Sequence, residues 1–379
     1  MFATTRINLQ LPVSWNRCTL QQLRAIAQAI TSCAFRSSRY KPYDMTEVKV
    51  EVFMRLSGLE IVEPLNPLVP LEKQYYVCRL RPYGLEDGRL TRIVKRFGAW
   101  FSRSVLGKDD TFSLYLEQLS NWLVAYLDPQ TGKNVPGLLD WMDDTMMLTL
   151  PFSEVKRRYF PSSVPMQLLS ALVPRFFRPY KVFEGPSPLM DGFTWRRFRF
   201  AQDYMGFYAN AANRLLQVQK MGRSASSSDL VEACRQVDLA RSLFLATIFN
   251  ARIAYVEEST GRVRRGFSYQ SNQHTDNAPY FRAFPDEDWQ IVLLWWQGQM
   301  HWLGKTYPRV FKTQHVKGAP VNPLELYTRT TATMEKYLSA TAHDVDNEPY
   351  TTVIQHLEDI SKQNEENEKL RRQSKVKSK

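Results

Sequence analysis

Residues 194–248 read TWRRFRFAQDYMGFYANAANRLLQVQKMGRSASSSDLVEACRQVDLARSLFLATI and decide the fold, because two long helical patterns flank a short Ser-rich link. The first pattern carries apolar residues at helical spacing: Phe198, Ala201, Met205, Tyr208, Ala212, Leu215 and Leu216. The second begins where Asp229 can cap a helix and carries Leu230, Cys234, Val237, Phe244 and Ile248. Because the link from Gly222 to Ser228 is flexible, we expect the two helices to lie antiparallel.

Further helices are expected on both sides of this hairpin. Thr19 and Gln22 form a capping box that begins a helix from about 20 to 34, and Gly58 ends an apolar stripe that starts at Met45. Apolar residues at helical spacing also predict helices over 111–126, 286–303, 324–338 and 350–360. In the helix from 286 the four Trp residues are expected to form a packing seam.

Two stretches depart from this pattern. Residues 252–269 alternate with a period near two around the turn Glu258–Gly261, which predicts a β-hairpin. In residues 72–106, Gln74–Cys78 reads as a short strand and Leu90–Leu106 as a basic helix, and both assignments stay open.

The expected fold is therefore mainly α, a multi-helix protein with a small β-hairpin appendage. We expect an N-terminal helical region over 1–128, an irregular Pro- and Gly-rich connector over 129–192 and a C-terminal helical domain over 193–360. After Ile360 the apolar stripe stops. Residues 361–379 are therefore expected to project or stay disordered as a basic tail.

Composition narrows the class of protein. The chain has 379 residues, of which 44% are hydrophobic, so it can bury one large core or several smaller ones without disulfide bonds or structural metals. Its four Cys residues are scattered, which is typical of a reducing compartment. No apolar run approaches the roughly 18–20 residues that cross a bilayer, so we expect no membrane span and no membrane partner.

Charge is concentrated in the first part of the chain. The formal net charge is +12, and residues 1–100 hold 15 Lys and Arg against 8 Asp and Glu. Five cations also follow Glu368 near the C-terminus: Arg371, Arg372, Lys375, Lys377 and Lys379. Such a tail is usually a solvated end, although contact with nucleic acid or an acidic protein stays open.

Catalytic constellations are not evident in the sequence. No His occurs before His274, and the Asp140, Asp143 and Asp144 cluster has no further acid or His at metal spacing. His343–Asp344 reads as a surface dipeptide, and Gly107–Lys108 lacks the Ser or Thr of a phosphate loop. We therefore expect no enzyme activity, no metal and no cofactor.

Aromatic and basic residues alternate at the start of the first long helix. Arg196, Arg197 and Arg199 could bind phosphate while the neighbouring rings stack on bases. On a helix, however, the aromatic residues face largely away from these cations, so a core of rings with solvated Arg residues is the competing interpretation.

A family resemblance rests on three groups of residues. They are Pro12-Val13-Ser14-Trp15-Asn16 leading into Thr19–Leu23, Gly185-Pro186 with Phe193-Thr194-Trp195, and Leu294-Trp295-Trp296 through Tyr307-Pro308-Arg309-Val310-Phe311. These pieces resemble uncharacterised proteins of tailed phages and integrated mobile elements.

The resemblance implies a virion component or a morphogenesis factor near the tail module. We therefore expect a non-enzymatic structural protein of a phage-like particle, in the host cytoplasm or the virion, that contacts other virion or assembly proteins or copies of itself. The alternative is a nucleic-acid-binding protein that uses the basic N-terminal region and the C-terminal tail. The sequence fixes neither the oligomeric state nor the partner.

Overall fold

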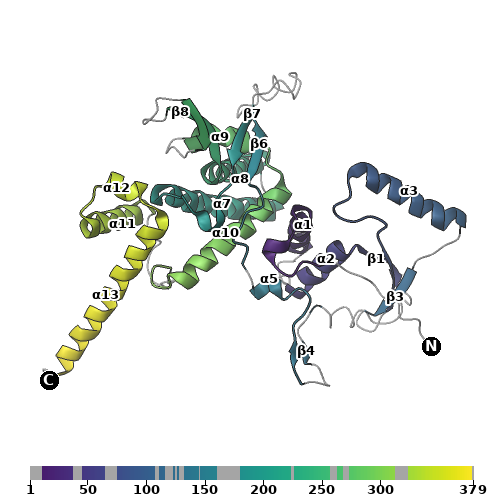
Figure 1. Ribbon diagram of the computed structural model, residues 1–379, viewed down its shortest axis with the longest axis horizontal. Helices are drawn as coiled ribbons and strands as arrows, with labels where there is room; N and C mark the ends of the chain where they lie inside the picture. The colour runs from purple at the N-terminus through teal and green to yellow at the C-terminus, as the bar shows by residue number, and fades with distance from the viewer. Residues whose placement is uncertain are drawn as a thin grey trace. The chain divides into compact units, whose positions relative to one another are not determined.

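The computed structural model describes residues 11–36, 45–64, 75–106, 111–115, 123, 126–127, 132–144, 146–159, 180–222, 226–256, 263–267, 273–311 and 323–377 (Figure 1). By its internal packing the chain divides into two units. Unit 1 comprises residues 1–148 and 285–298, and unit 2 comprises residues 149–284 and 299–379. The domain ranges expected from the sequence stay a prediction.

The described part of the chain is mainly α, as predicted. Unit 1 contains a 3-10 turn η1 (Trp15–Arg17) and these helices and strands: α1 (Leu20–Arg36), α2 (Met45–Ser57), β1 (Leu59–Pro64), β2 (Tyr75–Leu80), α3 (Arg89–Leu106), β3 (Thr111–Tyr115), β4 (Tyr126–Leu127), β5 (Asn134–Val135) and α5 (Trp141–Asp144). Helix α10 (Asp286–Thr306) runs from unit 1 into the residues of unit 2. Unit 2 also contains β6 (Glu154–Arg158), β7 (Tyr180–Glu184), η4 (Pro188–Met190), α7 (Trp195–Met221), α8 (Ser227–Ile248), β8 (Asn250–Val256), β9 (Val263–Phe267), α9 (Gln273–Phe281), α11 (Pro323–Leu338), α12 (Ala342–Asn347) and α13 (Tyr350–Lys377).

Helices α1 and α2 form the first part of the unit 1 core. The predicted capping box at the start of α1 is confirmed, because the Gln22 amide nitrogen donates to Thr19 Oγ1 and the Thr19 amide nitrogen donates to Gln22 Oε1. Leu23 and Ile26 on α1 and Val52 and Phe53 on α2 are buried. The stripes read from the sequence are therefore the packed faces.

The Trp-rich start of α10 is also core, as predicted. Trp289, Trp295 and Trp296 are buried, with the rings of Trp295 and Trp296 6.2 Å apart. Gly298 lies so close to residue 147 that a Cβ atom would come within 2.4 Å of the Met147 carbonyl oxygen. This close approach explains why a glycine stands inside the helix.

The helix expected over 111–126 is wrong at its start. Residues Thr111–Tyr115 form strand β3, which pairs antiparallel with β2 in the sheet β1-β2-β3. In this segment Phe112 lies opposite Cys78, and the β-branched and aromatic residues suit a pleated surface. The rest of the expected helix lies largely outside the described residues. Strand β2 confirms the open assignment at Gln74–Cys78 apart from its first residue, which is not described.

The predicted helical hairpin is confirmed as α7 and α8. Arg197 bonds to the end of α8 at Thr247 and Ile248, whereas Arg214 bonds to Gln236, so the two helices run antiparallel. The N-cap of α8 is Ser226, which accepts from the Asp229 amide nitrogen. The expected cap at Asp229 is therefore wrong by three positions, since this residue instead accepts a hydrogen bond from the Ser226 hydroxyl.

The predicted β-hairpin is confirmed as β8 and β9, and β6 and β7 extend it into the antiparallel sheet β6-β7-β8-β9. The sequence missed these two strands, which lie in the stretch read as an irregular connector. Beneath the sheet, Phe183, Phe249, Phe281 and Phe284 form a cluster of buried rings.

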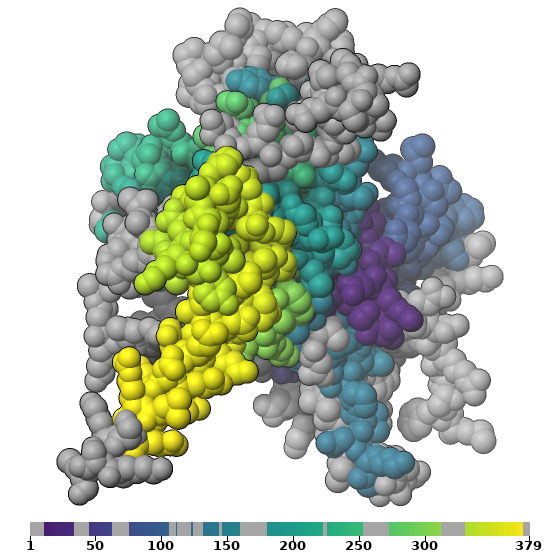
Figure 2. Space-filling model, turned by 60° about the vertical axis from the view of Figure 1, so that its left-hand side comes forward, coloured from purple at the N-terminus to yellow at the C-terminus, as the bar shows by residue number. Residues whose placement is uncertain are grey.

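Helix α13 begins inside unit 2 and ends as an arm. Tyr350, Val353 and Ile354 are buried, and the Tyr350 hydroxyl donates to the Leu189 carbonyl oxygen at 2.6 Å. From Glu366 to Gln373 every residue is exposed, and the yellow helix leaves the packed helices of its unit in Figures 1 and 2. The tail projects as expected, and its described part is helical to Lys377. Arg372 and Glu368 form an i,i+4 ion pair along it.

Candidate interaction surfaces

Helix α3 has seven exposed large apolar side chains, all on one face of the helix. At about 100° per residue, these seven side chains fall within an arc of roughly 140°. The exposed members are Leu90, Ile93, Val94, Phe97, Trp100, Phe101 and Val105. Leu90 is 79% exposed, Val94 69% and Phe97 63%, so this face is turned to solvent. An exposed apolar helix face of this kind usually packs against another part of the protein, a partner protein or a membrane.

The opposite face of α3 is basic. It carries Arg92, Lys95 and Arg103, with Arg96 and Arg89 toward its border with the apolar arc, and the helix contains no Asp or Glu. The helix therefore combines an apolar aromatic side with a cationic side.

The loop before α3 holds the basic face in place. Arg92 donates from Nε to the Asp87 carbonyl oxygen at 2.7 Å, and Arg96 donates from Nη2 to the Tyr83 hydroxyl at 2.9 Å. The guanidinium of Arg96 also lies 5.1 Å from the Tyr83 ring centroid. Lys95 pairs with the Asp87 carboxylate at 2.8 Å, and this contact lowers the pKa of Asp87. We call residues 81–88 the brace, because they fix which side of α3 faces outward.

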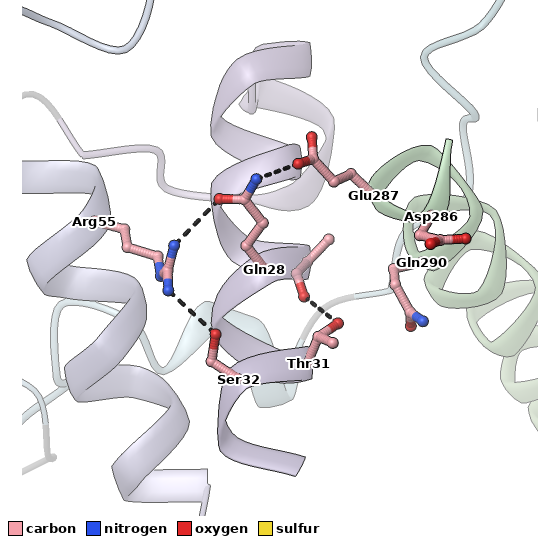
Figure 3. Close-up of a pocket in the computed structure, with 8 residues that line it drawn as sticks. Gln28, Thr31, Ser32, Arg55, Asp286, Glu287 and Gln290 are labelled. Carbon is pink, nitrogen blue, oxygen red and sulfur yellow. Dashed lines mark hydrogen bonds between the residues drawn. The ribbon is translucent and has the colours of Figure 1, made fainter. Parts of the chain in front are cut away.

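A second candidate is a pocket of about 270 Å³ in unit 1, whose lining residues are mostly of polar type (Figure 3). Residues of α1, α2 and the first turn of α10 line it. Gln28 stands between Arg55 and Glu287, accepting from the first and donating to the second, and Arg55 also donates to Ser32. These polar groups satisfy one another. We therefore interpret the pocket as part of the hydrogen-bonded packing between helices, and not as a ligand site.

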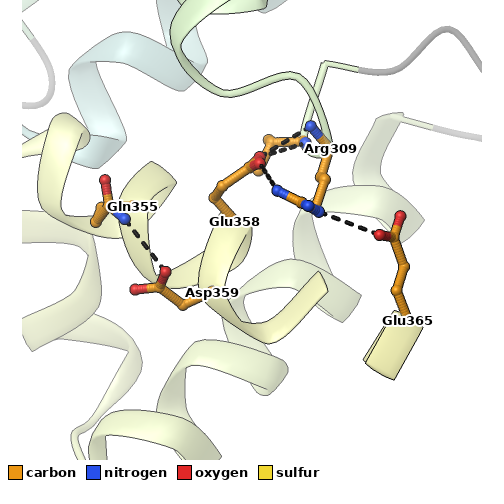
Figure 4. A network of polar contacts seen from close by, with 6 residues as sticks. Arg309, Gln355, Glu358, Asp359 and Glu365 are labelled. Carbon is orange, nitrogen blue, oxygen red and sulfur yellow. Dashed lines mark hydrogen bonds and ion pairs between the residues drawn. The ribbon is translucent and has the colours of Figure 1, made fainter. Parts of the chain in front are cut away.

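A third feature is the polar clamp that anchors the arm, formed by Arg309, Glu358 and Glu365 (Figure 4). The Glu358 carboxylate accepts from the amide nitrogens of Arg309 and Val310 at 2.9 and 3.0 Å and from Arg309 Nη1 at 2.9 Å. Arg309 Nε reaches Glu365 at 3.2 Å, and these two carboxylates raise the pKa of Arg309. The clamp thus ties the turn after α10 to two points on α13.

The cations expected to contact nucleic acid differ in their exposure and contacts. Arg197 is 3% exposed and donates to the carbonyl oxygens of Thr247 and Ile248, so this expectation is wrong for Arg197. Arg196 and Arg199 are half-buried and lie over the rings of Phe200 and Trp195.

The tail cations lie elsewhere on the chain. Arg371 and Arg372 are exposed on the arm, and the described helix also includes positions 375 and 377. Lys379 lies outside the described residues. Contact of these tail cations with nucleic acid or an acidic partner stays a prediction.

Three of the acidic candidates, Asp140, Asp143 and Asp344, have structural partners. Lys49 pairs with Asp140 at 2.8 Å and with Asp143 at 2.6 Å, and hydrogen bonding to Lys49 lowers the pKa of Asp140. Asp344 completes the capping box of α12 with Thr341. Where the structure describes the chain, no group of three or more His, Cys, Asp or Glu residues is placed to hold a metal ion.

Comparisons with known proteins do not identify the chain: no family model, no curated protein and no solved structure matches it. Among the described helices, none is long and apolar enough to span a bilayer.

The apolar face of α3 was not identified from the sequence as a candidate interaction surface. Its pattern was visible as apolar residues at positions 90, 93, 94, 97, 100, 101 and 105 with cations between them. Only the structure distinguishes an exposed apolar stripe from a buried one.

Proposed function

We propose that the protein is a non-enzymatic structural or morphogenesis protein of a phage-like particle that acts through protein–protein contacts. In this proposal it works in the host cytoplasm and in the particle, and its first partner is another copy of itself. The resemblance to phage and mobile-element proteins supports the setting, and the arm formed by the second half of α13 supports the mode of action.

The charge order along the arm is the observation that carries the proposal. Glu366 and Glu368 precede Lys369, Arg371 and Arg372, so an acidic and a basic segment follow one another along the exposed part of the helix. When two such helices lie antiparallel, the acidic segment of each faces the basic segment of the other. The arm is therefore complementary to a second copy of itself.

The clamp makes this contact favourable because it fixes the direction of the arm. Glu358 is 7% exposed and ties α13 to the backbone at Arg309 and Val310. A helix held at its base loses less conformational freedom on association than a flexible tail would.

Light scattering of the purified chain tests the proposal. Full-length protein should be a multimer at low salt, whereas protein ending at Ile360 should be a monomer. The double charge reversal Arg371→Glu/Arg372→Glu should also be monomeric. Adding Glu366→Lys/Glu368→Lys to that variant swaps the two charged segments and should restore a multimer. A full-length monomer, or a multimer unaffected by the truncation, would contradict the proposal.

The second candidate function is nucleic-acid binding by Arg371 and Arg372, which the structure leaves exposed. Its signature would be binding of nucleic acid that weakens steeply with salt and is lost in Arg371→Gln/Arg372→Gln. If that variant still binds nucleic acid, Arg371 and Arg372 are not the binding residues and no longer support this second function.

A further inference from the structure

We propose that α3 lies flat on an anionic membrane surface, with its apolar face in the boundary between headgroups and acyl chains. The proposal goes beyond self-association of the arm and uses a different helix in a different unit. It also departs from the expectation of no membrane partner, because a helix can lie on a bilayer without crossing it.

The apolar side of α3 has the composition of an interfacial helix. Phe97, Trp100 and Phe101 are all exposed, and their rings suit the level of the lipid headgroups. The rings of Phe97 and Trp100 lie 5.6 Å apart, near the middle of the helix along its length. Aliphatic side chains continue the same face along the helix at Leu90, Val94 and Val105.

Charge specifies the kind of surface. The five cations of α3 stand without any acidic residue in the helix, and residues 1–100 carry an excess of cations. Phosphate-bearing lipids complement this charge, and each Lys or Arg close to such a surface strengthens binding several-fold. Arg89 lies at the border of the apolar arc, where its side chain can reach the headgroups.

The width of the apolar arc favours a lipid surface over a groove in a protein. A helix that docks in a groove uses a narrow ridge of anchors three, four and seven residues apart. On α3 the exposed apolar side chains spread over roughly 140°, which suits a flat surface.

The brace prepares the helix for this role. Tyr83 and Asp87 bind Arg92, Lys95 and Arg96 on the polar side, so the apolar side is the one that faces outward. The helix does not have to turn over before it meets a membrane.

Co-sedimentation of the full chain with vesicles tests the proposal. Vesicles of equal parts phosphatidylcholine and phosphatidylglycerol should retain the protein, and pure phosphatidylcholine vesicles should retain at least about tenfold less. The double variant Val94→Ser/Phe97→Ser should lose about tenfold or more of the binding to the anionic vesicles, since it removes two apolar side chains from the inserted face. Both positions are already exposed, so the variant should melt like the parent.

Leu216→Ser/Val231→Ser is the matched control, because these two residues of α7 and α8 are also exposed. It should bind anionic vesicles as the parent does. Protein ending at Ile360 should also bind, which separates this test from that of the arm. Equal retention on both vesicle types, no retention on either, or equal loss in both double variants would overturn the proposal. If the parent does not bind vesicles and Val94→Ser/Phe97→Ser loses self-association, the apolar face of α3 is a protein contact instead.

Discussion

The clamp at the base of α13 makes a quantitative prediction. Glu358→Ala removes the acceptor of three hydrogen bonds, two of them from the backbone of Arg309 and Val310. Hydrogen bonds to a charged group contribute about 1.5–3 kcal/mol each, but Arg309 is partly exposed and solvent will replace part of its bond. We therefore expect a loss of about 3 kcal/mol, which corresponds to a Tm lower by about 6–12 °C in a unit of this size.

Calorimetry of a graded series checks this value. Glu358→Gln keeps one acceptor oxygen and should lose about half as much. Glu365→Gln is the matched control because Glu365 is 42% exposed, and it should lose less than about 1 kcal/mol. If Glu358→Ala melts with the parent, the clamp does not fix the arm. If Glu365→Gln is as destabilising as Glu358→Ala, the ranking of the two carboxylates by exposure is wrong.

Four further predictions follow from particular side chains. Trp296→Ala should lower the free energy of unfolding by about 3–5 kcal/mol in a denaturant titration, because it empties a buried site. Gly298→Ala should lower the Tm measurably, since its Cβ would meet the Met147 carbonyl oxygen. The contribution of Asp87 to the brace should be present above pH 3.8 and lost as the pH falls through its lowered pKa, which carboxyl NMR would locate. Truncation after Ile360 should leave the Tm within a few degrees of the parent when both are monomeric at high salt, because the residues removed are mainly exposed.

The helical body could be predicted because its signals are local. The cap at Thr19 is set by neighbouring residues, and α7 and α8 lie where they were predicted. Their predicted stripes are buried only in part, because Phe198 and Phe244 are in the core whereas Leu216, Leu230 and Cys234 are exposed. Strand β3 was missed because Phe112 and Tyr115 fit a helical period as well as a strand. Its pairing partner β2 lies far away in the sequence and decides between the two.

The candidate surfaces were less predictable for the same reason. Arg197 resembles its neighbour Arg196 in the sequence, yet packing of α7 against α8 buries only the first of them deeply. The clamp joins Arg309 to Glu358 across 49 positions, and no local pattern announces such a pair. Helix α3 shows the converse case, because its local pattern is clear but only tertiary structure reveals that its apolar face is exposed.

Cross-linking between isotopically labelled and unlabelled copies tests the central claim most directly. Lys362 and Lys369 are exposed on the arm and provide amines for the reagent. An antiparallel pair of arms predicts mixed-isotope cross-links that join Lys369 of one copy to the arm of the other, and the charge-reversed variant Arg371→Glu/Arg372→Glu should lose them. Cross-links confined to single copies would contradict the account.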